Sequence, residues 1–446
     1  MLIRFSVSNF CSFKDEAELN MIPSRERAHK DQVFKSSSQN TTNLLRGAII
    51  YGSNASGKSN LVKAISYAKN LILKGKAPNK KLDLQYFRLD HNSANNPSRF
   101  EFEIQCNNRM YAYGFELFNT HVHEEWLYLI KPNDEELIFE RKNHEEDTFQ
   151  FGKSLEKLPD EDIQFLNFVA KGTRTNQLFL PETINRNLDN FNDIYRWFDR
   201  TLKIISPNSE PNGIEFKISE DSTFKDYLTK VLDLADTGIS EIRTEKVSLN
   251  ELGSVPHKLV ERIREDLEDD EAALIADTER RKRIVLRKEG GELVAYKLST
   301  THKCSESNLD ITFDLDEESD GTRRLIELTP ALYEMAFSQV DSVHIIDEID
   351  RSLHPHLTRL LVREHLESEK NANSQLIVTT HETSLLDVSL IRRDEIWFIQ
   401  KNESGSSKLY SLNNFQPRYD KDIRKDYLLG RYGAIPFVGD FKRLNR

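Results

Sequence analysis

The chain has 446 residues, of which 38% are hydrophobic and 30% are charged, and its formal net charge is −11. This composition is typical of a folded globular protein and excludes a disordered or fibrous chain. The acidic balance argues against a protein that coats nucleic acid over its whole surface, although it leaves room for a local basic patch. The 3 cysteines contain no C-x-x-C pair, which disfavours a disulfide framework or structural zinc site. No apolar run approaches the roughly 18 residues of a membrane span, so we expect a soluble, cytoplasmic protein.

The first part of the chain predicts strands around one helix. Residues 2–10 alternate apolar and polar side chains, as a half-buried strand does. A short apolar run at 47–52 ends in glycine and suits a buried strand. Apolar residues at three- and four-residue steps predict a helix over 58–72. Residues 100–130 have the pattern of strands that are joined by Asn-rich turns.

The later part of the chain predicts helices and then further strands. The segment 188–286 has a mostly helical, strongly charged pattern, and this is clearest at 260–288, where acidic and basic residues interleave as on a solvent-facing helix. Strand-like pieces return at 294–300 and 311–315. The closing third contains two short apolar strands, "SVHIIDE" and "QLIVTTH", which are separated by a helical pattern at 357–366.

The stretch "GSNASGKSN" matches the phosphate-binding pattern G-x-x-x-x-G-K-[ST]. Glycines allow backbone N–H groups to close on phosphate oxygens, and the helix that follows directs its positive end toward them. In this pattern Lys58 reaches the β- and γ-phosphates, and the Ser59 hydroxyl ligates Mg²⁺. The predicted nucleotide-binding residues are Gly52, Ser53, Asn54, Ala55, Ser56, Gly57, Lys58, Ser59 and Asn60.

The two late strands supply acidic and basic candidates for the same site. Asp347 ends the first of them and could hold Mg²⁺, while Glu348 beside it could orient or deprotonate the attacking water. His381 ends the second strand, where it could contact the γ-phosphate and sense its loss. We therefore predict Lys58, Glu348 and His381 as catalytic residues, and Ser59 with Asp347 as the metal ligands.

The order of these motifs selects the class of ATPase. Lys58 and Asp347 stand on either side of most of the chain, whereas kinases and small GTPases close this site within one compact domain. An ATP-binding-cassette head accommodates such an insertion, and it adds a Ser-x-Gly turn that opens a helix shortly before the Walker B strand. Here that turn is formed by Ser319, Asp320 and Gly321, where the glycine and the helix N-terminus suit contact with phosphate.

Over nearly its full length, the chain resembles the SMC-like ATP-binding-cassette ATPases of the AAA/OLD-type branch, in particular RloA-like proteins and AriA-type ATPases of the PARIS phage-defence system. The motifs that carry this resemblance are "FSVSNFCSFKDEAEL", "YGSNASGKSNLVKAI", "FDLDEESDGTRRLIELTPAL", "VHIIDEIDRSLHP", "LIVTTHETSLLD", "LIRRDEIWFI" and "DYLLGRYGAIPF".

The resemblance implies that two heads sandwich ATP, each completing the other's site. It assigns a signature that acts in trans to Ser319, Gly321 and Thr322, and a dimer-crossing D-loop to Asp350, Arg351 and Ser352. It implies that His381 is the switch histidine. The segment 177–185 is the best candidate for the glutamine-containing Q-loop. Ser12, Phe13 and Lys14 are candidates for contacts with the adenine. The signature departs from the family pattern because Asp320 replaces a glycine, and Arg323 and Arg324 follow.

We therefore predict an α/β fold of the ABC-ATPase head type, with a mixed phosphate-loop sheet, an antiparallel β subdomain and an inserted helical arm. Residues 1–185 would form the first part of the head with Walker A and the β subdomain. Residues 186–300 would form the inserted arm. Residues 301–446 would complete the head with the signature, Walker B, D-loop and switch histidine.

The predicted activity is Mg²⁺-dependent ATP hydrolysis at composite sites in a homodimer or a higher homo-oligomer. Three cellular roles remain open. The protein could be the sensor of a phage-defence pair with a separate TOPRIM-like nuclease or toxin as effector, a DNA-repair ATPase that binds DNA ends, or a scaffold whose ATP binding sets the oligomeric state. The basic cluster of 280–283, Arg287 and Lys288 could contact nucleic acid, but dense acids before it make a salt-bridged surface the favoured interpretation.

Overall fold

The computed structural model describes residues 1–36, 38, 40–143, 147–207, 213–247, 257–269, 271–277, 282–304, 309–368, 373–418 and 421–436. The chain divides into two compact units. The first unit comprises Met1–Pro207, Gln339–Asp350 and Arg359–Arg446, and the second comprises Asn208–Ser338 and Arg351–Thr358. The second unit therefore extends past residue 300 and includes the predicted signature. In the described part of the chain, no helix combines the length and apolar character that crossing a bilayer requires.

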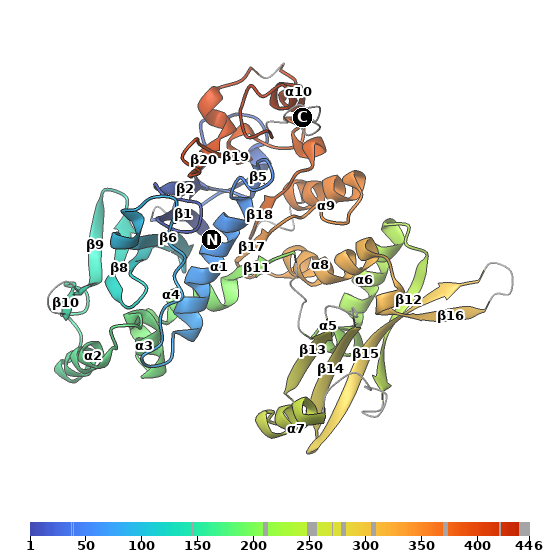
Figure 1. The fold of residues 1–446 in the computed structure, drawn as a ribbon, viewed down its shortest axis with the longest axis horizontal. Helices are drawn as coiled ribbons and strands as arrows, with labels where there is room; N and C mark the ends of the chain where they lie inside the picture. Colours follow the sequence, from blue (N-terminus) through green and yellow to red (C-terminus); the bar gives the residue numbers. More distant parts are fainter. Residues whose placement is uncertain are drawn as a thin grey trace, which may run out of the picture. The chain divides into compact units, whose positions relative to one another are not determined.

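A six-stranded mixed sheet carries the phosphate loop (Figure 1). Its strands, in spatial order, are β11 (Leu202–Ile205), β17 (Ser342–Ile346), β18 (Ser374–Thr379), β5 (Gly47–Tyr51), β19 (Ile396–Lys401) and β20 (Ser407–Ser411). All neighbouring pairs are parallel except β19 with β20. Every residue of β5, β17 and β18 is buried, which explains why consecutive apolar residues occur in each strand, although β17 and β18 also bury polar side chains.

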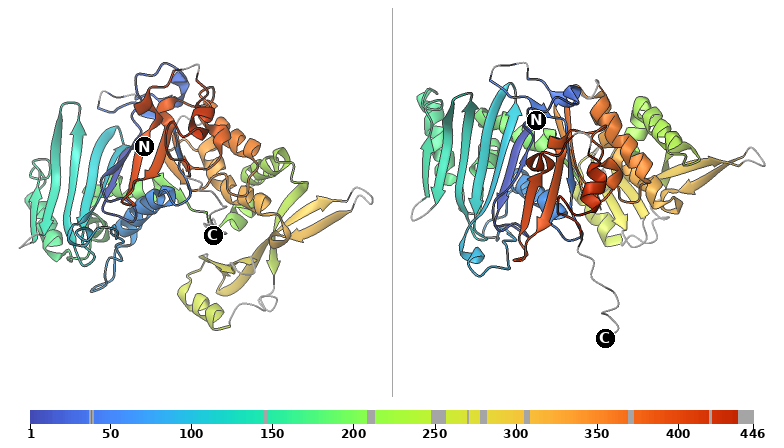
Figure 2. Two further views of the ribbon diagram at one scale, coloured as in Figure 1. Left: turned by 45° about the horizontal axis from the view of Figure 1, so that its top comes forward. Right: turned by 90° about the horizontal axis from the view of Figure 1, so that it is seen from above.

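A seven-stranded antiparallel sheet forms the predicted β subdomain of the first unit. Its strands, in spatial order, are β10 (Asp147–Phe151), β9 (Asp134–Asn143), β8 (Val122–Lys131), β7 (Arg109–Leu117), β6 (Ser98–Cys106), β1 (Leu2–Ser8) and β2 (Ala17–Asn20). Burial alternates along β6, so one face packs on the core while the other carries charged side chains. The edge strand β2 lies beside β20, where the two sheets of this unit meet (Figure 2).

Both sheets share one hydrophobic core with the helix that follows the phosphate loop. This helix, α1 (Lys58–Lys74), buries Leu61, Ala64, Ile65 and Ala68, at the three- and four-residue steps that predicted it. The remaining helices of the first unit are α2 (Asp160–Gly172), α3 (Phe179–Asn185), α4 (Asn192–Arg196), α10 (Ile423–Leu428) and most of α9 (Pro355–Glu367), and β3 (Val33–Phe34) pairs with β4 (Leu44–Leu45).

The second unit corrects the prediction of an inserted helical arm. It contains a five-stranded antiparallel sheet whose strands are β12 (Ile239–Val247), β15 (Glu292–Lys303), β14 (Lys282–Glu289), β13 (Ala272–Asp277) and β16 (Asp310–Asp314). Its helices are α5 (Ile214–Glu220), α6 (Ser222–Leu234), α7 (His257–Asp266) and α8 (Asp320–Phe337). The charged stretch 260–288 is therefore one short helix followed by two strands. Its aliphatic runs are strand-length, and pairing with β15 buries Val285 and Leu286.

The basic cluster lies partly on this sheet. Arg283 is paired with the buried Glu215 at 2.5 Å, and Arg287 with Glu220 at 3.0 Å. The Lys288 ammonium donates to two backbone carbonyls. Residues 280 and 281 lie outside the described residues. Arg283 and Arg287 are therefore salt-bridged, as the favoured interpretation expected, although they lie on a strand and not on a helix.

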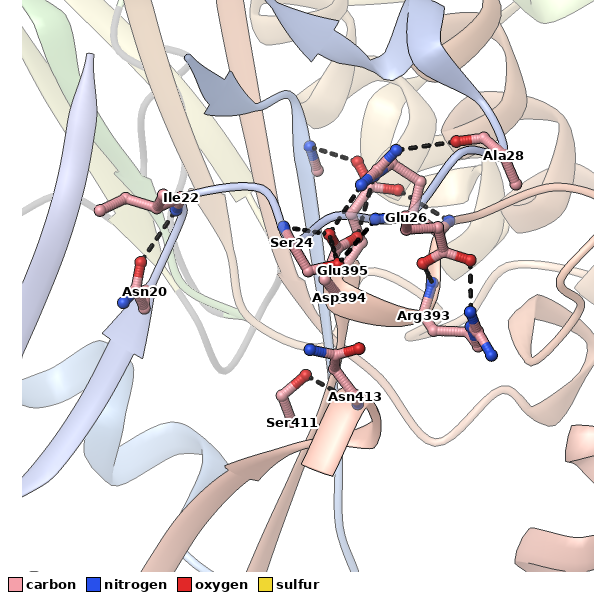
Figure 3. A network of polar contacts seen from close by, with 12 residues as sticks. Asn20, Ile22, Ser24, Glu26, Ala28, Arg393, Asp394, Glu395, Ser411 and Asn413 are labelled. Atoms are coloured by element: carbon pink, nitrogen blue, oxygen red, sulfur yellow. Dashed lines mark hydrogen bonds and ion pairs between the residues drawn. The ribbon is translucent and has the colours of Figure 1, made fainter. Parts of the chain in front are cut away.

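A polar network anchors the N-terminal segment to the start of β19 (Figure 3). The buried Arg392 guanidinium donates to both carboxylate oxygens of Asp394, at 2.9 and 2.7 Å. Asp394 also accepts from the backbone and hydroxyl of Ser24, each at 2.7 Å. Next to it, Arg393 donates to Glu26 through Nε at 3.0 Å. Because β19 is the neighbour of β5, this network fixes one side of the strand that delivers the phosphate loop.

Glu395 is a fully buried carboxyl group at the other end of β5 from the loop. It accepts hydrogen bonds from the backbone N–H of Gly47 at 3.3 Å and of Arg392 at 3.0 Å. Burial raises the pKa of Glu395 to about 8, because desolvation penalises the charged carboxylate more than these donors stabilise it.

Candidate nucleotide-binding site

The phosphate loop connects β5 to α1, and two of its glycines are required by close contacts. A Cβ at Gly52 would lie 2.6 Å from the Ile399 carbonyl oxygen. Gly57 has a φ of 119°, in the left-handed region that favours glycine, and a Cβ there would lie 2.8 Å from the Ser12 hydroxyl. The loop backbone is thus packed against its neighbours, and α1 begins immediately after it. The N-terminus of that helix suits the binding of an anion.

Lys58 is the buried cation of this loop. Its ammonium donates to the carbonyl oxygens of Gly52 at 2.8 Å and Ser53 at 3.3 Å. Burial lowers the pKa of Lys58 to about 8, and the nearby Asp347 and Glu348 carboxylates oppose that shift. The site therefore holds a cation that is poorly solvated and electrostatically coupled to the two acidic residues of β17's end.

Those acidic residues are fixed by one side chain of the neighbouring strand. Asp347 is buried, and its carboxylate accepts a hydrogen bond of 2.5 Å from the Thr379 hydroxyl. The backbone N–H of Glu348 donates to the same hydroxyl at 2.8 Å. Glu348 has a φ of 51°, which non-glycine residues adopt only when the surroundings hold them there. The structure thus brings Asp347 and Glu348 together with Lys58 at the carboxyl edge of the sheet.

The end of β18 adds His381 to the same group. The Asp350 carboxylate accepts from the Thr380 hydroxyl at 2.7 Å and from the His381 backbone N–H at 3.3 Å. Desolvation and the Lys58 cation lower the pKa of His381, while Asp350 and Glu348 act in the opposite direction. His381, which was predicted from the end of this strand, is therefore close enough to Lys58 and to the acidic residues for their charges to change its pKa.

A chain of hydrogen bonds supports the loop from behind. The Asn60 amide donates to the Ser12 hydroxyl at 2.8 Å, the Ser12 and Ser407 hydroxyls are 2.8 Å apart, and the Ser407 hydroxyl donates to the Ser56 carbonyl at 2.5 Å. The motifs did not reveal Ser407, because it lies far along the chain in β20 and carries no local pattern. Thr379 and Thr380 were also missed, although their place before His381 in "IVTTH" was a usable signal.

A pocket of about 400 Å³ adjoins Asn60 and Ser12 on the first unit. It is lined by Cys11, Ser12, Asn60, Gln85, Tyr86, Phe87, Arg88, Leu89, Lys401 and Gly405. Of the three residues predicted for the adenine side, only Ser12 lines it. The Phe13 ring is buried in the hydrophobic core, and the Lys14 ammonium forms an ion pair with Asp90.

The glutamine predicted for the Q-loop lies away from the phosphate loop. Gln177 is buried and forms a hydrogen bond with Glu182. Its side-chain amide lies next to Gly75, 3.8 Å from the position that a Cβ on that glycine would take. Gly75 caps the carboxyl end of α1, and the phosphate loop precedes its first residue. A helix of 17 residues is about 25 Å long, so Gln177 does not reach the phosphates. The position of this segment in the sequence suggested a Q-loop, but in the structure it packs near the carboxyl end of α1.

Gly321 of the predicted signature and Ser352 of the predicted D-loop lie together within the second unit. Ser319 is the N-cap of α8, and its hydroxyl accepts from the Thr322 backbone at 3.1 Å. A Cβ on Gly321 would lie 2.7 Å from the Ser352 carbonyl oxygen, so glycine permits this approach. Asp320 forms an ion pair with Arg323 at 2.7 Å. Asp350 belongs to the first unit and Arg351 and Ser352 to the second.

Comparison with known proteins gives a family and structural similarities. The model of the family described as "AAA domain, putative AbiEii toxin, Type IV TA system" matches residues 48–387. The SMC head domain from Thermotoga maritima is similar with a TM-score of 0.37 and 14% identity, over 92% of this chain and 98% of that one. An SMC head bound to the C-terminal winged-helix domain of ScpA is similar with a TM-score of 0.41 and 11% identity, over 93% and 99%. No curated protein matches the chain.

The family match covers the phosphate loop, α8, β17 and His381 in one stretch. It extends over well over half of the chain. The chain therefore belongs to this family of AAA-domain proteins.

Proposed function

We propose that this protein is a Mg²⁺-dependent ATPase whose nucleotide is held at the carboxyl edge of β5, β17 and β18. The observation that carries the proposal is that Asp347 and Glu348, which Thr379 holds together, lie close enough to Lys58 and His381 to oppose the lowering of the pKa of both groups. These four residues come from three separate stretches of the chain. A buried cation, two carboxylates and an imidazole beside a helix N-terminus match the requirements of phosphoryl transfer.

The residues present fit a magnesium ion together with a nucleotide. Asp347 offers a buried carboxylate at a fixed position, and Ser59 offers an exposed hydroxyl in the first turn of α1. Hard oxygen ligands in small number suit Mg²⁺, which keeps several waters and shares phosphate oxygens. When bound, Mg²⁺ would neutralise charge on the phosphates. The pocket beside Asn60 has the size and position for the nucleoside.

In this proposal Glu348 accepts a proton from the attacking water as the water oxygen bonds to the γ-phosphorus. The bond between that phosphorus and the bridging oxygen breaks, and ADP leaves with the electron pair. Lys58 and His381 stabilise the negative charge on the phosphate oxygens during this step. Glu348 follows the end of β17 and has a left-handed backbone conformation, with a φ of 51°.

The proposal includes a composite site in a dimer. Ser319, Gly321 and Thr322 would contact the nucleotide of a second copy, and Asp350, Arg351 and Ser352 would cross the interface. The N-cap geometry of Ser319 and the close packing of Gly321 on Ser352 support this, because they present a helix N-terminus on a rigid turn.

The proposed cellular role is a sensor ATPase that regulates a separate effector, a TOPRIM-like nuclease or a toxin, in phage defence. The family description, which names a toxin–antitoxin system, supports it, and so does the resemblance to the OLD-type branch. A DNA-end-binding role is less favoured, because Arg283 and Arg287 are engaged by carboxylates. A scaffold with little turnover is the remaining alternative, and measurable hydrolysis by the complete complex would exclude it.

Two substitutions test the activity. Glu348→Gln should bind ATP and remain dimeric with hydrolysis reduced at least about 10²-fold, the usual contribution of a general base. Lys58→Ala should lose ATP binding. The exposed Glu403→Gln serves as the control and should behave as wild type. Hydrolysis by Glu348→Gln at the wild-type rate would refute the assignment of the base, and normal ATP binding by Lys58→Ala would refute the phosphate-loop assignment.

A further inference from the structure

Thr379 contacts the acidic pair of the candidate site, and although it precedes His381 in the motif "LIVTTHETSLLD", no function was predicted for it. It is the last residue of β18, which lies between β17 and β5, and its side chain is fully buried. Its two neighbouring strands carry the acidic pair and the phosphate loop. A side chain at this point is therefore in a position to influence both acidic residues at once.

The Thr379 hydroxyl makes two hydrogen bonds of opposite direction. It donates to the Asp347 carboxylate at 2.5 Å and accepts from the Glu348 backbone N–H at 2.8 Å. A hydroxyl has one proton and two lone pairs, so it can serve both partners simultaneously. The Thr379 carbonyl accepts from the Ile349 N–H at 3.1 Å, which continues the contact to the next residue. Three successive residues after β17 are thus held by one threonine.

The conformation that these bonds hold is an unusual one. Glu348 has a φ of 51°, and at a non-glycine residue this left-handed backbone is costly unless neighbours impose it. The Thr379 hydroxyl is the acceptor that receives the N–H of that same residue. Without this acceptor, the N–H of Glu348 would lose its partner and the backbone would be free to relax to a right-handed or extended conformation, which would turn the glutamate side chain in another direction.

We propose that Thr379 is a positioning residue for ATP hydrolysis, which orients the Glu348 carboxylate and fixes the rotamer of Asp347. The inference rests on the proposed ATPase function. It adds that the hydroxyl, and not the bulk of the side chain, sets the geometry of the two acids. A buried threonine that merely fills space would be replaceable by valine, which has the same shape.

The test uses Thr379→Val and Thr379→Ser in the full-length protein, compared with Thr173→Val. Thr173 is also a buried threonine of the first unit, and its hydroxyl donates to the Val169 carbonyl at 2.9 Å, in the region of α2. It therefore controls for the loss of a buried hydroxyl as such. For each variant, ATP binding is measured by calorimetry, steady-state hydrolysis gives kcat and KM, and hydrogen exchange reports on the amides of 343–352.

We expect Thr379→Val to bind ATP within about threefold of wild type and to lose about 10- to 100-fold in kcat, as expected for a misoriented catalytic group. Exchange at Glu348 should accelerate. Thr379→Ser should retain a kcat within about threefold of wild type, because it keeps the hydroxyl. Thr173→Val should leave kcat and the exchange of 343–352 unchanged.

Two results would overturn the role of Thr379 while the ATPase proposal stands: wild-type kcat in Thr379→Val, or an equally slow Thr379→Ser. A loss of ATP binding that matches the loss of kcat would also overturn it, because the residue would then only maintain the fold. If the wild-type protein itself does not hydrolyse ATP in the presence of its partners, the proposed function fails, and the inference fails with it.

Discussion

The hydroxyl of Ser407 donates a hydrogen bond to the carbonyl of Ser56, across a distance of 2.5 Å. One residue lies in β20, near the end of the chain, and the other lies in the phosphate loop. Together with the hydrogen bonds of Ser12 and Asn60, this contact connects the phosphate loop to β20, the edge strand of the six-stranded sheet. The conformation of the loop therefore depends on a residue that no phosphate-binding motif includes.

Ser407→Ala should weaken nucleotide binding without abolishing it. The substitution removes the donor to Ser56 and the partner of Ser12, and a buried hydrogen bond contributes about 0.5–1.5 kcal/mol. We therefore expect the Kd for a non-hydrolysable ATP analogue to rise about 3- to 10-fold. Isothermal titration calorimetry measures it. Ser411→Ala, on the same strand, removes a cap on the Asn413 N–H and should leave the Kd unchanged. Equal Kd values for wild type and Ser407→Ala would contradict the supporting role.

Nucleotide binding should be linked to protonation of Lys58. Because burial lowers the pKa of Lys58 to about 8, a substantial fraction is neutral near pH 8.5 in the nucleotide-free protein. Phosphate oxygens favour the charged form, so binding should raise this pKa and take up a proton, and affinity should fall as the pH rises above about 8. Calorimetry at pH 8.5 in two buffers of different ionisation enthalpy gives the uptake.

Lys58→Arg provides the comparison for that experiment. Arginine stays charged throughout this range, so any binding that the variant retains should show no proton uptake from this position. The same uptake in wild type and Lys58→Arg would mean that another group titrates, and the link to Lys58 would be wrong.

Asp350→Asn should affect turnover more than binding. The Asp350 carboxylate holds the Thr380 hydroxyl and the His381 backbone, and so sets the loop that carries the histidine. Replacing one oxygen by an NH₂ group weakens charge-assisted bonds, and we expect kcat to fall about 10-fold. The Kd for the ATP analogue should remain within about threefold. If the Kd of Asp350→Asn rises by the same factor by which its kcat falls, Asp350 supports nucleotide binding and does not act by positioning the loop that carries His381.

Protein stability should fall with rising pH because of Glu395. Its pKa in the folded protein is raised to about 8 from an ordinary value of 4.5, so the native state binds more protons than the unfolded state between these values. Stability contributed by this group is therefore present below about pH 4.5 and is lost as the pH rises toward about 8. Glu395→Gln cannot titrate and should flatten that dependence. Urea unfolding at pH 5, 6.5 and 8 measures it, and parallel slopes for both proteins would refute the assignment.

Local patterns in the sequence were sufficient for the elements with simple periodicity. The continuous apolar runs of β5, β17 and β18, the three- and four-residue steps of α1, and the Ser319 cap of α8 all correspond to structure. In each case the signal lies within a few residues of the feature, because backbone hydrogen bonding and burial of one face follow from local spacing. Local signals also carried the predictions of the candidate site, because the phosphate loop has its own motif and Asp347, Glu348 and His381 stand at the ends of apolar strands.

Only the tertiary structure decided the features that depend on distant partners. The inserted lobe contains a sheet because the aliphatic run of β14 pairs with β15 on one side and with β13 on the other, whereas the sequence showed only interleaved charge. Gln177 lies at the far end of α1, Phe13 lies in the core, and Ser407 reaches the phosphate loop from β20. The sequence by itself was enough to predict the candidate phosphate-binding residues. Packing between segments far apart in the chain determined which side chains hold the phosphate loop and its neighbouring acids in place. Such long-range contacts could not be predicted, because they produce no periodic pattern in the sequence.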